Sequence, residues 1–260
     1  MNNTNKNFCF CTLALGDKYR LMVKQLALDL EKFSPDTLLI VGTDKISDFK
    51  NCSNVSAFKQ HQTGVLKCYS DKRFVIEKAL EKFESAIFID ADTRIVRNIP
   101  NSLKYNPGIT ANHRNLIQHI NKYGNRNLEI FQELAAKLNV KMEDSKWIGD
   151  SLFIVTKDNG KEKEFLRTWG LISKYLELKG IHSGVGRMMG LACQKVGFNL
   201  ENSEDWKSVR RNTQHLDASD NKYQKSFSFW KNFKSRLGYH YRLNKARLSS
   251  LKNFNFYYRS

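Results

Sequence analysis

Two aspartates that follow a short apolar run are the residues best placed to do chemistry. Residues 86–89 are all apolar, and Asp90 and Asp92 come directly after them, separated by one small residue. In an extended backbone, residues two apart point to the same side, so both carboxylates would face one point. Oxygen ligands of this kind suit Mn²⁺ or Mg²⁺, which would neutralise a diphosphate as it becomes a leaving group. A buried aspartate without a partner is costly, so this placement favours a metal–diphosphate site over a chance pattern.

Strand and helix patterns alternate in the N-terminal half and would position these aspartates. Apolar runs predict buried strands at 8–15, 37–41 and 86–89, and apolar residues at helical spacing predict helices over 21–33 and 70–83. This order predicts an α/β fold with a mixed, mostly parallel sheet flanked by helices. Ligands bind such sheets at the carboxyl ends of the strands, which here are 13–17, 42–44 and 90–92.

The second half of the chain has a looser pattern. It predicts a strand at 109–111, a helix over 128–138, a strand over 147–155 that begins through Gly149 and Asp150, and a helix over 161–178. Three glycines crowd residues 184–190 without forming a dinucleotide-binding fingerprint. They would either admit a sugar close to the backbone or let a helix pack tightly.

The string around Asp90 and Asp92 resembles the metal-binding signature of GT-A glycosyltransferases, which transfer sugars from nucleotide sugars. It is most similar to family 8, the group of glycogenin and the bacterial lipooligosaccharide galactosyltransferases. The stretch Ala14–Tyr19 resembles the uridine loop of that family, although Gly16 stands where the family has an aspartate that reads the base. Arg73 lies near the position of the basic residue that reaches the nucleotide sugar.

A late histidine and lysine extend the resemblance. His215 and Lys222 resemble the family's His, which completes the metal shell, and its Lys, which binds the diphosphate, although their spacing is one residue longer here. The family's acidic motif in the third quarter has no clear match, and residues 182–190 in that place carry no carboxylate. The family implies retention of anomeric configuration, whereas inversion would need a general base. Asp150 or the pair Glu143-Asp144 would supply it.

The resemblance implies a GT-A (Rossmann-like) fold and a metal-dependent transferase. It would move a hexose from a nucleotide diphosphate sugar, UDP-linked, to a hydroxyl acceptor on a glycan or a lipid-linked saccharide. The implied roles are Asp90, Asp92 and His215 for Mn²⁺ or Mg²⁺; Ala14, Tyr19, Asp44, Arg73, Asp90 and Lys222 for the donor; and Asp150 and His182 near the reacting carbon or the acceptor. Tyr19 would stack on the base or pack on the first helix, and Asp44 would contact the nucleotide or only form a turn.

Two other functions remain open. A sugar-nucleotide nucleotidyltransferase also carries acidic metal ligands on an α/β sheet, but it opens with a glycine-rich triphosphate loop, and residues 13–20 contain one glycine. A non-catalytic protein could instead bind membrane or nucleic acid through the basic C-terminus. Salt-dependent binding of generic DNA without affinity for sugar nucleotides would identify the latter.

The charge of the chain is concentrated at its C-terminus. The formal net charge is +17, and after Asp220 there are ten basic residues and no acidic one. We expect a catalytic domain over 1–221 and a basic, aromatic helical appendage over 222–260, broken near Gly238 and residues 239–241. Its apolar residues recur at spacings of three and four, typical of a helix that lies on an anionic membrane surface. Packing on the catalytic domain is the alternative, and nucleic acid is disfavoured.

Compartment signals are few. Five cysteines form no C-x-x-C pair, which favours small buried hydrophobes in a reducing compartment over a zinc site. No apolar run reaches the ~18 residues of a transmembrane helix, and the first residues contain no apolar signal region. These features predict a cytoplasmic location, with peripheral attachment to the inner face of the membrane as an extension.

Overall fold

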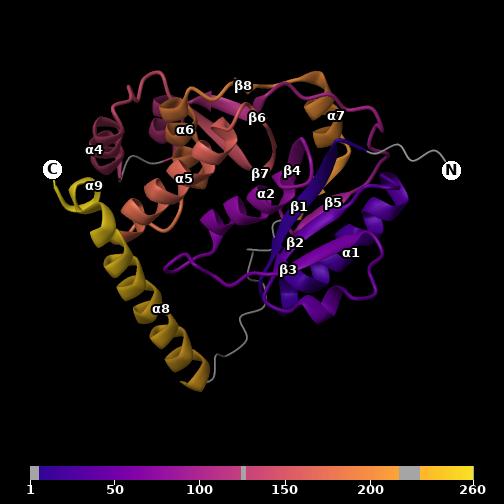
Figure 1. Cartoon of the computed structure of the whole chain (residues 1–260), viewed down its shortest axis with the longest axis horizontal. Coiled ribbons are helices and arrows are strands. Elements are labelled where there is room, and N and C mark those ends of the chain that lie inside the picture. The colour runs from indigo at the N-terminus through magenta and orange to yellow at the C-terminus, as the bar shows by residue number, and fades with distance from the viewer. Residues whose placement is uncertain (1–5, 124–126, 217–228, 260) are drawn as a thin grey trace.

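A seven-stranded sheet with helices on both faces forms the centre of the molecule (Figure 1). The computed structural model describes residues 6–123, 127–216 and 229–259. The strands are β1 (Phe8–Ala14), β2 (Leu39–Thr43), β3 (Val55–Lys59), β4 (Ser85–Ile89), β5 (Thr93–Ile95), β6 (Gly108–Asn115), β7 (Lys146–Thr156), β8 (Leu200–Glu201) and β9 (Thr213–His215). The helices are α1 (Asp17–Phe33), α2 (Lys72–Leu80), α3 (Leu116–Tyr123), α4 (Leu128–Leu138), α5 (Lys161–Leu178), α6 (Val185–Val196), α7 (Glu204–Arg211), α8 (Phe229–Ser250) and α9 (Phe254–Tyr258). Single 3₁₀ turns occur at Ile46–Phe49, Tyr69–Asp71 and Leu251–Asn253.

The strand order of the main sheet is β3-β2-β1-β4-β7-β6-β8. β3, β2, β1 and β4 pair in parallel, as do β6 and β8, whereas β7 runs antiparallel to both of its neighbours. The predicted α/β fold with a mixed, mostly parallel sheet is therefore confirmed. β3 lies where the sequence predicted only a loop, because this edge strand is half-buried and lacks a clear alternation of apolar and polar residues.

Alternation along the strands supplies two hydrophobic cores. Phe8 and Phe10 of β1 face α1 and α7, while Cys9 and Cys11 face the opposite side, where α2, α5 and α6 lie. The four side chains are buried because both faces of the sheet are covered. The two cysteines therefore share one face of the strand, as their spacing predicts.

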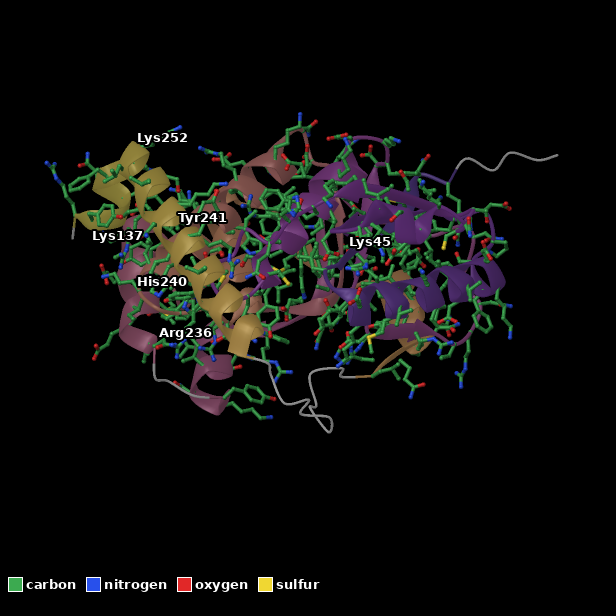
Figure 2. All side chains as sticks on the ribbon, turned by 90° about the horizontal axis from the view of Figure 1, so that it is seen from below. Lys45, Lys137, Arg236, His240, Tyr241 and Lys252 are labelled. Atoms are coloured by element: carbon green, nitrogen blue, oxygen red, sulfur yellow. The ribbon has the colours of Figure 1, made fainter. Side chains whose placement is uncertain are left out.

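The C-terminal helix α8 is continuous through Gly238, so the predicted break there is wrong. One glycine inside a helix costs only about 1 kcal/mol, and α8 lies against α5, which helps to hold it straight. The apolar residues Leu237, Tyr241 and Leu248 of α8 are 55%, 67% and 69% exposed, and Figure 2 shows Tyr241 on this helix. In contrast, Tyr257 of α9 is buried in the core beside α5.

Membrane-spanning helices were not expected from the apolar runs. Within the three described ranges, none of the helices combines the length and the apolar character that crossing a bilayer requires.

Candidate active site

The carboxyl edge of β4 carries the two predicted aspartates. β4 is buried along its whole length, and the chain turns directly after it, where the Thr93 amide donates to the Asp90 carbonyl at 3.0 Å. Asp90 and Asp92 both line one cavity of about 340 Å³ at this edge of the sheet. This arrangement is consistent with the prediction that the carboxylates of Asp90 and Asp92 face one point.

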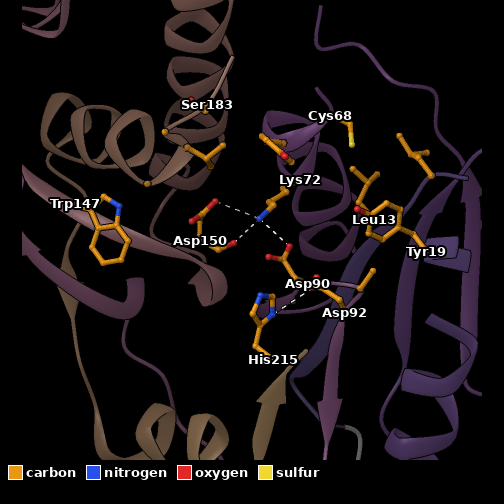
Figure 3. A pocket seen from close by; sticks show the side chains of 16 residues that line it. Leu13, Tyr19, Cys68, Lys72, Asp90, Asp92, Trp147, Asp150, Ser183 and His215 are labelled. Atoms are coloured by element: carbon orange, nitrogen blue, oxygen red, sulfur yellow. Dashed lines mark hydrogen bonds and ion pairs between the residues drawn. The ribbon is translucent and has the colours of Figure 1, made fainter. Parts of the chain in front are cut away.

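A lysine that the sequence analysis did not single out, Lys72, lies between the carboxylates of Asp90 and Asp150 (Figure 3). The Nζ atom of Lys72, the first residue of α2, lies 2.9 Å from Asp90 Oδ1 and 3.5 Å from Asp150 Oδ2. It also donates to the Asp150 carbonyl oxygen at 2.7 Å. Burial tends to lower the pKa of Lys72, but the two aspartates outweigh burial and raise the pKa above its ordinary value. Lys72 is therefore a buried ammonium that stays charged at neutral pH.

Antiparallel pairing explains why Asp150 reaches the same place. β7 runs antiparallel to β4 with Leu152 opposite Ile89, and the Asp90 amide donates to the Ser151 carbonyl at 2.9 Å. Asp150 therefore continues the strand next to Asp90, and it lines the cavity. Among the candidates for a general base, the other two, Glu143 and Asp144, are exposed and do not line it.

A second, two-stranded sheet delivers His215. β5 follows Asp92 and pairs antiparallel with β9, with Thr93 opposite His215. The Nδ1 atom of His215 lies 3.5 Å from Asp92 Oδ1 and 3.3 Å from the Thr93 hydroxyl, and His215 also lines the cavity. The Leu216 amide donates to the Asp92 carbonyl at 2.8 Å, which secures this pairing.

Aromatic and small residues complete the cavity. Tyr19 enters from α1, Trp147 from β7, and Ser183 and Gly184 from the segment before α6. Burial, with help from the negative charge of Asp92, raises the pKa of the Tyr19 phenol, so this side chain stays neutral. The cavity thus combines aromatic faces with carboxylates, a lysine and an imidazole.

Several residues predicted for the nucleotide do not line this cavity. Ala14 is buried at the end of β1, and its neighbours Leu13 and Leu15 line the cavity instead. Asp44 accepts hydrogen bonds from the Gly16 amide and from Arg20, at 3.2 Å and 2.5 Å, so it fixes the turn between β1 and α1.

Arg73, His182 and Lys222 were also predicted for the site. Arg73 follows Lys72 on α2 but lines a different cavity, between α2, α5 and α8. His182 precedes the cavity-lining Ser183, and its Nδ1 atom is buried without a hydrogen-bond partner among the described residues, near the Tyr239 ring. Lys222 lies outside the described residues.

The glycines of residues 184–190 let α6 pack closely on β7. A methyl group on Gly186 would overlap the Ile148 carbonyl oxygen, and one on Gly190 would overlap the Lys146 carbonyl oxygen. Gly184 adopts a φ of 88°, a left-handed conformation that favours glycine at this helix start. Of the two interpretations left open by the sequence, tight helix packing therefore accounts for Gly186 and Gly190.

The donor types fit a divalent cation, although they are not gathered into a preformed centre. Carboxylates and an imidazole are ligands for Mn²⁺, and Asp90 Oδ2 makes no hydrogen bond or ion pair with another described residue. In the described part of the chain, no group of three or more His, Cys, Asp or Glu side chains is arranged to hold a metal ion.

Lys72 is the principal residue that sequence reasoning missed. Its signal was weak: it directly precedes Arg73, in the helix before the aspartate strand. A basic pair at that position left open which of the two side chains turns to the site.

Comparisons with known proteins bear on the fold. No protein-family model matches the sequence, and no curated protein sequence matches it. The galactosyltransferase LgtC, solved in complex with donor and acceptor sugar analogs, has a similar structure, with a TM-score of 0.51 and 9% identity over 89% of this chain and 95% of that chain. The apo bifunctional glycosyltransferase WbbM matches with a TM-score of 0.48 and 10% identity, over 84% of this chain and 47% of that chain. The likeness to LgtC identifies the fold of this chain as the Rossmann-like GT-A fold.

Proposed function

We propose that the chain is a metal-dependent glycosyltransferase that moves a hexose from a nucleotide diphosphate sugar, UDP-linked, to a hydroxyl acceptor. The observation that carries this proposal is the convergence of Asp90, Asp92 and His215 on one cavity at the carboxyl edge of the sheet. Ligands of α/β sheets bind at that edge. The shared fold with a galactosyltransferase and the resemblance to family 8 support the same reaction class.

Asp90, Asp92 and His215 would hold the divalent cation. When bound, the cation neutralises negative charge on the diphosphate leaving group. Lys72 orients Asp90 by binding Oδ1, which leaves Oδ2 for another partner. Its positive charge would also attract the donor's phosphates into the cavity.

Aromatic and carboxylate groups would place the donor. Tyr19, which is 37% exposed at the cavity wall, offers a face on which the base can stack. Asp150 is held beside Lys72 and would lie near the reacting carbon. A carboxylate engaged by an ammonium suits positioning and charge stabilisation better than proton abstraction, which favours retention over inversion.

A glycan or lipid-linked saccharide is the acceptor class that we propose, with α8 attached to an anionic membrane surface. The exposed Leu237, Tyr241 and Leu248 lie on a helix that also carries the exposed Arg236 and Arg247. Apolar and cationic side chains exposed together suit a lipid interface. Sedimentation with vesicles of rising anionic lipid content checks this, and a chain that stays in the supernatant at low salt would refute the attachment.

A thermal-shift panel tests the function. UDP, GDP, CMP and their sugars are compared with and without Mn²⁺, and a ligand at ~100 times its dissociation constant should stabilise the fold by about 2.7 kcal/mol. We expect stabilisation by UDP and a UDP-hexose that depends on Mn²⁺, and its loss in Asp92→Asn, which keeps size but removes a charge. Full activity in Asp92→Asn, or stabilisation by nucleoside triphosphates with sugar phosphates instead, would contradict the proposal.

A further inference from the structure

A second cavity, separate from the candidate active site, lies between α2, α5 and α8. Its volume is about 550 Å³, and it shares no lining residue with the cavity of Asp90 and Asp92. Its basic lining residues come from three helices and one loop: Arg73 from α2, Lys174 from α5, Arg242 and Lys245 from α8, and His61 from the segment after β3.

The two carboxylates in this cavity are committed to the backbone. Asp71 Oδ2 accepts from the Thr63 amide at 2.8 Å, and Glu177 Oε1 accepts from the Val65 amide at 3.0 Å. Both therefore hold the segment that passes over the cavity. Within the described ranges, no carboxylate lies within ion-pair distance of Arg73. Within the same ranges, no carboxylate lies within ion-pair distance of Lys174, Arg242 or Lys245 either.

Packing holds two of the cations in place. The Arg73 guanidinium lies 3.8 Å from the centre of the Phe74 ring, and a methyl group on Gly170 of α5 would come within 2.9 Å of its Cζ atom. The Arg242 side chain donates from Nε to the Val65 carbonyl at 3.0 Å, which leaves its terminal nitrogens for another partner. Such fixed guanidinium groups are the preferred partners of phosphate.

The charge balance of the cavity is positive. Burial and the neighbouring Arg73 lower the pKa of Lys174, although Glu177 opposes that shift. Burial raises the pKa of Glu177 to about 7, so this carboxyl is only partly ionised at neutral pH. Burial also raises the pKa of Asp71. Four cationic side chains thus face these two buried carboxyl groups and the exposed Glu77, which also acts electrostatically on Arg73.

We propose that this cavity is a binding site for a phosphate group, held by Arg73, Lys174 and Arg242 with the exposed Lys245 at its rim. A neutral sugar would not require so many unpaired cations, because desolvating a charge without a partner is unfavourable. A phosphate offers several acceptor oxygens to guanidinium and ammonium donors at once. The inference does not rest on glycosyl transfer at the first cavity.

Two sources could supply the phosphate: a soluble phosphorylated ligand or the headgroup of a lipid. Tyr241 and Lys245, which line the cavity from α8, are both exposed, and Figure 2 shows Tyr241 on the outer face of the molecule. A ligand could therefore enter from solution or from a surface on which α8 rests.

Calorimetric titration of the full chain with inorganic phosphate and pyrophosphate, at constant ionic strength and with a chelator present, tests the site. Arg73→Gln should weaken binding about tenfold or more, because a charge-assisted hydrogen bond is lost. Arg167→Gln, which changes an exposed arginine on α5 outside the cavity, is the matched control and should change affinity less than about twofold. Gly170→Ala keeps every charge but displaces the Arg73 guanidinium, and it should also weaken binding.

Vesicles distinguish the sources. Phosphatidylcholine vesicles with phosphatidic acid should bind less well to Arg73→Gln than to Arg167→Gln, and soluble glycerol phosphate should compete, if the ligand is a headgroup. Phosphate binding without such competition would identify a soluble ligand. Phosphate binding no tighter than chloride, or wild-type affinity in a folded Arg73→Gln, would overturn the proposal.

Discussion

Replacing Lys72 with methionine should destabilise the fold much more than the same change at a surface lysine of the same helix. The Lys72 ammonium is buried and lies 2.9 Å from Asp90 Oδ1 and 3.5 Å from Asp150 Oδ2. Methionine keeps most of the side-chain volume but removes the positive charge. Two carboxylates would then face one another without a cation between them.

The geometry sets the expected size of the effect. At 2.9 Å and an effective dielectric constant of about 20, one ion pair is attractive by about 6 kcal/mol, before the cost of desolvation. Removing one partner from a fully buried pair costs about 3–5 kcal/mol. The side chains of Asp90 and Asp150 are 26% and 36% exposed, so water can solvate part of the released charge. We therefore expect a loss of about 2–3 kcal/mol of unfolding free energy.

Denaturant unfolding at pH 7 measures this loss, with Lys78→Met as the control. Lys78 also lies on α2, and its ion pair with Glu81 at 2.5 Å is about half exposed, so its loss should cost about 0–1 kcal/mol. In a Lys72→Met/Asp90→Asn double variant, the two losses should be coupled by about 1 kcal/mol or more. If Lys72→Met costs no more than Lys78→Met, Lys72 is not the cation that compensates these aspartates.

Three further predictions concern the metal shell, the helix packing and the pH dependence. His215→Ala should weaken UDP binding mainly when Mn²⁺ is present, whereas Lys222→Ala should weaken it with or without metal; a double variant with wild-type affinity in calorimetry would show that neither residue contacts the donor. Gly190→Ala should cost about 1–3 kcal/mol in denaturant unfolding through overlap with β7, whereas Gly149→Ala, where a methyl group has room, should cost little. The pKa of Glu177 is raised from 4.5 to about 7 by burial, so its contribution to stability is present below 4.5 and is lost as the pH rises through 7. Between pH 4.5 and 8, the unfolding free energy of Glu177→Gln should therefore fall by about 1 kcal/mol less than that of the unchanged chain, after allowance for partial exposure. An equal fall in both proteins would contradict burial of Glu177 as the cause.

Local patterns were enough to predict the framework of the fold. Residues 8–14, 39–43 and 85–89 form buried strands because continuous apolar runs need cover on both faces, and the order of strands and helices then implies a parallel sheet. The position of Asp90 and Asp92 at the end of such a strand is likewise readable from neighbouring residues alone. β3 escaped prediction because this half-buried edge strand lacks a clear alternation of apolar and polar residues, and β8 escaped because it has only two residues.

The partners of these aspartates are decided by contacts between distant segments. Asp150 reaches Asp90 through the antiparallel register of β4 and β7, and His215 reaches Asp92 through the pairing of β5 with β9, across 122 residues from Thr93. Neither register follows from the sequence, because strand pairing depends on the packing of the whole sheet.

The choice between Lys72 and Arg73 shows the same limit on α2. Successive residues on a helix point about 100° apart, so two adjacent basic side chains must face different surroundings. Composition and spacing established a basic pair before the aspartate strand. Only the packing of α2 between the sheet and α5 turns Lys72 to the aspartates and Arg73 to the second cavity.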